Sequence, residues 1–127
     1  MTEPTDVKHL WARLQNAAST GELLLEEGVA AEVAAACEEL IQGYGRLIDD
    51  ATSLQSVRGF GEIESGVQLA QKFSRKAVGG HDALVDRLEE HIAIVTMIQQ
   101  TVTTAAAKIE GEDHMLTAHL STIDPQL

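Results

Sequence analysis

The chain has 127 residues, and its 20 acidic side chains against 9 lysines and arginines give a formal net charge of −11. This acidic balance argues against a nucleic-acid binder, because phosphate contact needs clustered lysines and arginines. Aromatic residues make up only 3% of the chain, and both prolines, Pro4 and Pro125, lie near its ends. With Ala, Glu and Leu abundant, this composition predicts an all-α domain.

Targeting and redox features are few. No stretch approaches the roughly 20 apolar residues of a membrane span, so we expect none. The segment from Met1 to Asp6 has no basic region followed by an apolar one, so we expect no general secretory signal. The single cysteine, Cys37, rules out an internal disulfide and is interpreted as a small buried hydrophobic residue.

The first predicted element is a short amphipathic helix of about residues 6–18, inside an N-terminal extension of residues 1–19. Its apolar side chains recur at spacings of three and four: Val7, Leu10, Trp11 and Leu14. Ser19 and Glu22 have the spacing of a capping box. A long second helix is therefore predicted to begin near Thr20.

This long helix carries an apolar seam with heptad spacing. The seam residues are Val33, Cys37, Leu40, Tyr44, Leu47, Ala51 and Leu54. Two glycines, Gly59 and Gly61, bracket Phe60, which predicts that the helix ends around Ser56 and that a turn occupies about residues 57–64.

A second long helix is predicted to open at another capping box, Ser65 to Gln68. Its seam also has heptad spacing: Leu84, Leu88, His91, Val95, Ile98, Val102, Ala105 and Ile109. We expect the Gly79-Gly80 pair to lie in a continuous or kinked helix, the alternative being a break with Asp82 capping a new start.

Two heptad helices joined by a glycine-bracketed turn predict an antiparallel two-helix hairpin over residues 20–113. Residues 114–127 are predicted to form a C-terminal tail.

The sequence offers no pattern for catalysis, a cofactor or a metal. A di-metal bundle needs Glu-x-x-His pairs, and the only similar spacing is Asp6 to His9, whereas His114 and His119 are five residues apart. We therefore predict that the protein is not an enzyme and takes no cofactor. The only basic cluster, Lys72 to Lys76, is interpreted as a solvated helix face.

The apolar stripes are broader than a single seam, because further apolar residues flank it: Ile41, Ile48, Val85, Ile92, Ile94 and Met97. A two-helix hairpin cannot cover such stripes alone, so we expect two hairpins to form a four-helix bundle. The alternative is a three-helix monomer in which the N-terminal helix covers the groove. The predicted partner interface consists of Leu40, Tyr44, Leu47, Ile48, Leu88, Ile92, Val95 and Ile98.

A family resemblance rests on a diffuse set of residues. They are Phe60-Gly61, Ser65-Gly66, Leu69, Phe73, Lys76-Ala77, Gly79-Gly80, Leu84, Leu88, His91 and Val95. With this set and its hairpin length, the chain over about residues 20–113 resembles the WXG helical-hairpin superfamily, the small substrates and partners of actinobacterial type VII (ESX) secretion. The resemblance implies a homodimer, or a heterodimer with another helical-hairpin protein or a toxin N-terminal domain.

Two positions depart from the family pattern. Val57-Arg58-Gly59 stands where members carry Trp-x-Gly, and Ile109 with Asp113 stands where many carry a Tyr-x-x-x-Asp export signal. The resemblance therefore implies a chain that is cytoplasmic before export. It either leaves the cell with a partner that carries the signal, to become secreted or bound at the cell surface, or stays behind as a targeting helper.

The sequence thus predicts a protein–protein interaction module: a substrate, co-substrate or targeting partner in type VII secretion. The alternative is a cytoplasmic coiled-coil adaptor or structural protein unrelated to secretion.

Overall fold

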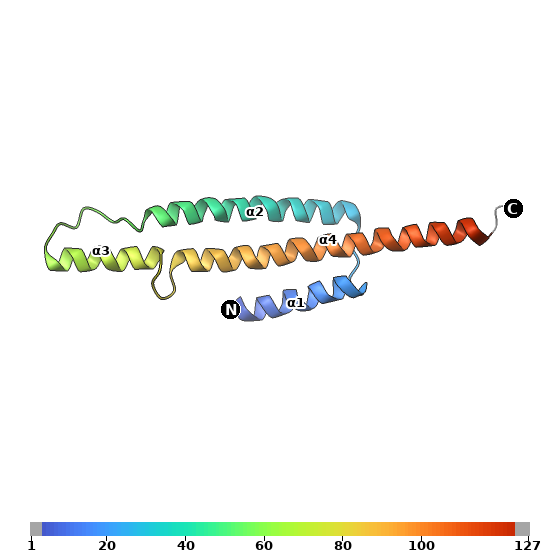
Figure 1. The fold of residues 1–127 in the computed structure, drawn as a ribbon, viewed down its shortest axis with the longest axis horizontal. Helices are drawn as coiled ribbons and strands as arrows, with labels where there is room; N and C mark the ends of the chain where they lie inside the picture. Colours follow the sequence, from blue (N-terminus) through green and yellow to red (C-terminus); the bar gives the residue numbers. More distant parts are fainter. Residues whose placement is uncertain (1–3, 124–127) are drawn as a thin grey trace. The chain divides into compact units, whose positions relative to one another are not determined.

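The computed structural model describes the backbone of residues 4–123 and the side chains of residues 6–107. The described part contains four helices: α1 (Pro4–Thr20), α2 (Glu27–Ser53), α3 (Glu64–Ala77) and α4 (Leu84–Ile123) (Figure 1). No strand occurs in residues 4–123, and the all-α prediction is confirmed.

The helices form two compact units. Unit 1 comprises the described residues up to Glu38 and from Ile94 onward, and unit 2 comprises Glu39–Ala93. Both α2 and α4 pass from one unit to the other, so each unit contains a part of both helices.

The first capping-box prediction is wrong, because α1 continues through Ser19 and ends at Thr20. Gly21 has a φ of +84° and donates its amide to the Ala18 carbonyl (3.3 Å), while the amide of Glu22 donates to the Ala17 carbonyl (2.9 Å). These two bonds are a Schellman motif, which needs a residue that tolerates positive φ. The same residues therefore end one helix, and α2 begins only at Glu27.

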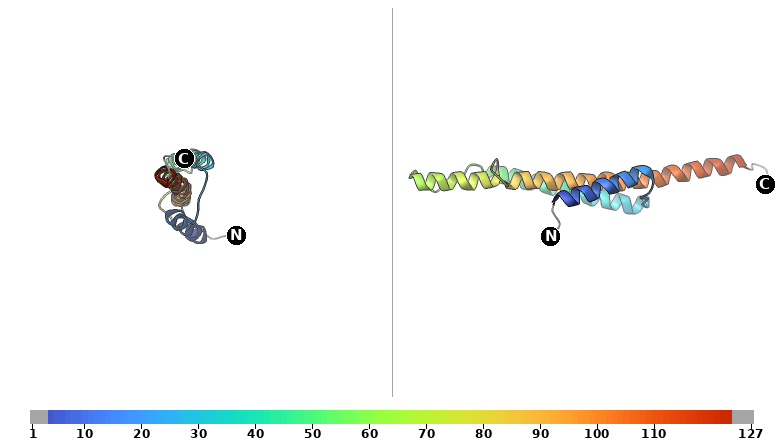
Figure 2. Two further views of the ribbon diagram at one scale, coloured as in Figure 1. Left: turned by 90° about the vertical axis from the view of Figure 1, so that its right-hand side faces the viewer. Right: turned by 90° about the horizontal axis from the view of Figure 1, so that it is seen from below.

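In unit 1, α1 and α2 lie on different sides of α4 (Figures 1 and 2). The Gln15 amide on α1 donates to the Gln100 side chain on α4 (3.2 Å). On the other side, the Gln99 amide donates to the Ala34 carbonyl of α2 (3.0 Å). Most of the buried side chains are small: Ala18, Ala30, Cys37, Val95, Thr101, Val102 and Ala105. Small residues let the three helices approach closely.

In unit 2, α2 ends at Ser53, three residues before the predicted end. The next three amides bond back to carbonyls three residues earlier, a tightened final turn that starts with Leu54 to Ala51 (3.0 Å). The loop of residues 54–63 follows, in which Gly59 and Gly61 have φ values of +101° and +81°. This backbone is the physical reason for the two glycines that bracket Phe60.

The second capping-box prediction is also wrong. Helix α3 begins at Glu64, and its N-cap residue is Ile63, which has an extended backbone and no side-chain capping bond. The buried Gly66 lies in the first turn, where the Phe60 carbonyl occupies the space that a β-carbon on residue 66 would need.

The expectation of a continuous helix through Gly79-Gly80 is wrong, and the alternative break is what the structure shows. Gly79 has a φ of +80°, and the Gly80 amide donates to the Arg75 carbonyl (3.1 Å), which again closes a helix C-terminus. Asp82 lies two residues before α4, and its carboxylate accepts a hydrogen bond from the Arg87 guanidinium.

Helix α4 continues to Ile123, beyond the predicted boundary at residue 113. The two positions predicted to form a degenerate export signal, Ile109 and Asp113, therefore lie on a helix, but outside the residues whose side chains are described. In the described part of the chain, none of the helices has the length and apolarity needed to span a bilayer.

Candidate protein-binding surfaces

The apolar face of α2 has a covered half and an uncovered half. The covered half contains Ala30, Cys37 and Ala51, which are buried and seven or fourteen residues apart. Beside it runs a row of larger side chains that stay exposed by 46%, 51% and 56%: Leu40, Leu47 and Leu54. Leu40 and Leu47 lie on α2, and Leu54 lies in the tightened turn that follows it. We call these three residues, all in unit 2, the leucine row.

The leucine row is exposed because the chain places its smallest apolar residues at the contact positions of α2. Alanine and cysteine are small enough to let a neighbouring helix approach α2 closely. The leucines, which lie at adjacent positions around α2, are then left without a contact to that neighbour. Covering the exposed half of one leucine stabilises a complex by about 1 kcal/mol, so a row of three is a substantial source of binding free energy.

The structure separates the predicted interface residues into two kinds. Leu88 and Val95 are only 8% and 7% exposed, so they belong to the core of the chain itself. Leu40 and Leu47 are exposed, and the remaining four residues are half-buried: Tyr44, Ile48, Ile92 and Ile98. Whether any of them contacts a partner stays a prediction.

Tyr44 of α2 stacks on His91 of α4, with ring centroids 5.5 Å apart and planes inclined by 29°. The pair joins the two helices within unit 2 at the edge of the leucine row. A stacked aromatic pair contributes about 0.5–1.5 kcal/mol beyond the burial of its surface.

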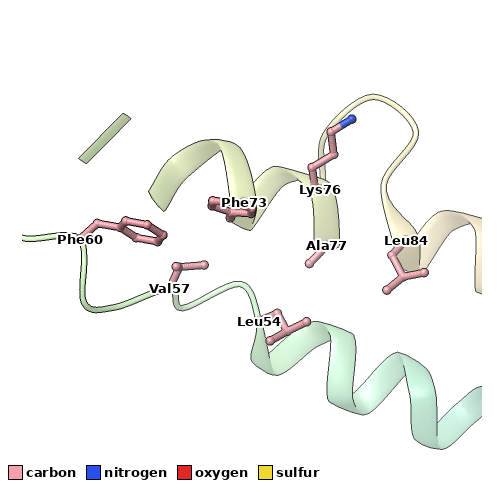
Figure 3. A pocket seen from close by; sticks show the side chains of 7 residues that line it. All are labelled: Leu54, Val57, Phe60, Phe73, Lys76, Ala77 and Leu84. Atoms are coloured by element: carbon pink, nitrogen blue, oxygen red, sulfur yellow. The ribbon is translucent and has the colours of Figure 1, made fainter. Parts of the chain in front are cut away.

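Unit 2 also contains an open apolar groove with a volume of about 380 Å³ (Figure 3). Its lining comes from the loop of residues 54–63, α3 and α4: Leu54, Val57, Phe60, Phe73, Lys76, Ala77 and Leu84. We call this feature the tip groove. The rings of Phe60 and Phe73 stack at one end with centroids 5.7 Å apart, and the Lys76 ammonium points away from Leu54 (Figure 3).

Of the predicted turn motif, only Val57 lines the tip groove, whereas Arg58 and Gly59 are exposed in the same loop. The sequence signal for the groove was an aromatic residue between two glycines, Phe60, but its partner Phe73 is thirteen residues away. Only the fold brings these two rings together.

The charge around the tip groove differs from that of the rest of the chain. Residues 54–80 contain four of the nine basic side chains, Arg58, Lys72, Arg75 and Lys76, but only two of the twenty acidic ones, Glu62 and Glu64. This segment is therefore net positive on a strongly acidic protein.

Two groups in the described part have shifted pKa values that bear on chemistry. Burial raises the pKa of the Cys37 thiol, which keeps it protonated and a poor nucleophile. A hydrogen bond from Arg87, followed by its positive charge, lowers the pKa of Asp82. Among the residues whose side chains are described, no group of three or more His, Cys, Asp or Glu could hold a metal ion.

Comparison with known proteins finds no match to this chain. No family model matches the chain, and a search of curated proteins and of solved structures finds no match to it.

Proposed function

We propose that this protein is a protein-binding module that pairs the leucine row, on α2 and the turn that follows it, with an apolar helix face of another chain. The observation that carries the proposal is the exposure of Leu40, Leu47 and Leu54 beside a buried row of small residues. The product is a four-helix bundle of two antiparallel hairpins, because leucines seven residues apart on one helix suit lengthwise packing against another.

The biological setting we propose is type VII secretion, with the protein acting as substrate, co-substrate or targeting partner. The support for this setting is the resemblance of residues 20–113 to WXG helical hairpins. Genes for secretion ATPases or for a helical-hairpin toxin beside the encoding gene are the expected finding. A locus without them would favour a coiled-coil adaptor unrelated to secretion.

The charge of the chain bears on the choice of partner. Two copies, each with a net charge of −11, repel one another at low ionic strength, and salt screens this repulsion over about 8–10 Å. A homodimer should therefore tighten as salt is added. A partner hairpin with a less acidic surface should bind without this requirement.

Light scattering after size-exclusion chromatography tests the proposal. A homodimer has twice the chain's 13.6 kDa, and Leu47→Asp should return the species to monomer mass. Ala31→Asp is the matched control, because Ala31 is exposed about half a turn round α2 from the leucine row. If the wild-type chain is monomeric, the same pair of variants is tested by co-purification with helical-hairpin proteins that neighbouring genes encode.

Far-UV circular dichroism shows whether the Leu47→Asp protein is still helical, which separates a lost interface from a lost fold. Helical Leu47→Asp protein that no longer dimerises supports the leucine row as the interface. A complex that survives Leu47→Asp with unchanged affinity contradicts the proposal.

A further inference from the structure

The tip groove is a second surface that the bundle interface does not use as a whole. It shares only Leu54 with the leucine row, and its volume of about 380 Å³ lies within the range typical of ligand pockets, about 300–1,000 Å³. Both aromatic rings that line it are partly exposed, Phe60 by 37% and Phe73 by 52%. The groove can therefore receive bulky apolar side chains without any opening of the core.

The edge of the groove is basic. Lys76 lines it, and Lys72 lies one helical turn earlier on the same side of α3, next to Phe73. No acidic residue occurs between Gly66 and Gly80, and the carboxylate that acts on Lys76 comes from the following turn: Asp82, which already accepts a hydrogen bond from Arg87. An apolar surface with a cationic edge complements a segment that is apolar and anionic at once.

The shape of the groove favours a peptide over a membrane surface. The groove is a hollow lined by three segments of the chain, which a protruding peptide side chain fills better than a flat bilayer surface does. The net charge of −11 opposes approach to an extended anionic membrane more than to a short acidic peptide, which carries fewer charges and meets mainly the local positive charge.

We propose that the tip groove binds an acidic amphipathic peptide segment, with bulky apolar residues against Phe60 and Phe73 and carboxylates against Lys72 and Lys76. The proposal rests on the proposed role as a protein-binding module, but it places a second binding site at the tip. Apolar contact supplies most of the affinity, and the lysines set the preference for negative charge.

Fluorescence anisotropy with a labelled synthetic peptide tests this site. The probe carries leucines at helical positions i, i+3, i+4 and i+7 with glutamates elsewhere, and a second probe has lysines in place of the glutamates. We expect the acidic probe to bind, more weakly as salt is added, and the basic probe to bind at least about tenfold less tightly.

Variants of the full chain locate the binding. Lys76→Glu should weaken the acidic probe by about tenfold, and the milder Lys72→Gln/Lys76→Gln pair by several-fold. Lys8→Glu makes the same change in net charge on exposed α1 and is expected to leave binding unchanged. Circular dichroism checks that each variant keeps the helix content of the wild-type chain.

The proposal would be overturned by no preference between the probes, or by equal losses in Lys76→Glu and Lys8→Glu. Binding of phosphatidylglycerol vesicles but not of the acidic peptide would also overturn it, in favour of a membrane surface. Leu47→Asp distinguishes the two proposals, because it should abolish the bundle and leave peptide binding at the tip intact.

Discussion

The ring of Phe60 lies almost parallel to that of Phe73, with 10° between the planes and 5.7 Å between the centroids. Behind it, the Phe60 carbonyl sits against Gly66, where no β-carbon could fit. The loop of residues 54–63 is therefore held to α3 by a ring contact on one side and a backbone contact on the other. These two contacts shape the tip groove.

Gly66→Ala should destabilise the protein by about 1–3 kcal/mol, because the new methyl group overlaps the Phe60 carbonyl and the loop must move. Denaturant unfolding gives the change in free energy. Gly45→Ala is the control, since no atom lies within 4 Å of the added β-carbon in the interior of α2. It should stabilise by up to about 1 kcal/mol. Equal effects of the two substitutions would show that the Phe60 contact is not tight.

Val95→Ala and Leu47→Ala should differ in their effect on the folded monomer. Val95 is buried, so its truncation leaves a cavity and lowers the free energy of unfolding by about 1–3 kcal/mol. Leu47 is half-exposed, and its truncation should cost less than about 1 kcal/mol at protein concentrations where the chain is monomeric. Urea titrations in dilute solution provide both values, and a larger loss for Leu47 would mean that the leucine row is already covered.

Cys37 should react slowly with iodoacetamide in the native protein and rapidly in urea. The side chain is 7% exposed, and burial raises the pKa of its thiol, so both access and the thiolate fraction are low. Mass spectrometry of timed samples measures the rate. Fast labelling under native conditions would contradict the packing of Cys37 in unit 1.

Asp82 should titrate below the ordinary aspartate range of about 3.9, because Arg87 donates to its carboxylate. A lowered folded-state pKa means that the pair stabilises the turn before α4 above the unfolded pKa, and that this contribution is lost as pH falls through the folded pKa. Side-chain carboxyl NMR follows the titration directly. Arg87→Ala should raise the pKa of Asp82, whereas Arg58→Ala should leave it in place.

Local sequence signals identified the helices better than their ends. Long heptad patterns without internal proline sufficed for α2 and for the seam of α4. Both capping-box predictions are wrong, because the Ser-x-x-Glu and Ser-x-x-Gln spacings do not by themselves determine the backbone conformation around them. Gly21 adopts positive φ and ends α1, and Gly66 brings α3 against Phe60. The same backbone freedom at Gly79 ends α3 where a continuous helix was expected.

The sequence alone determined that α2 has a wide apolar face, because heptad spacing places Cys37, Leu40, Tyr44 and Leu47 on one side of any helix. Only the tertiary structure decided how that face is divided. Cys37 and Ala51 are covered by the chain, while Leu40 and Leu47 remain exposed. Periodicity gives the direction of each side chain around the helix axis, but it does not say where the neighbouring helix lies. Side chains that differ by only about 40–60° around the axis can therefore be buried in the core in one case and exposed to a partner in the other.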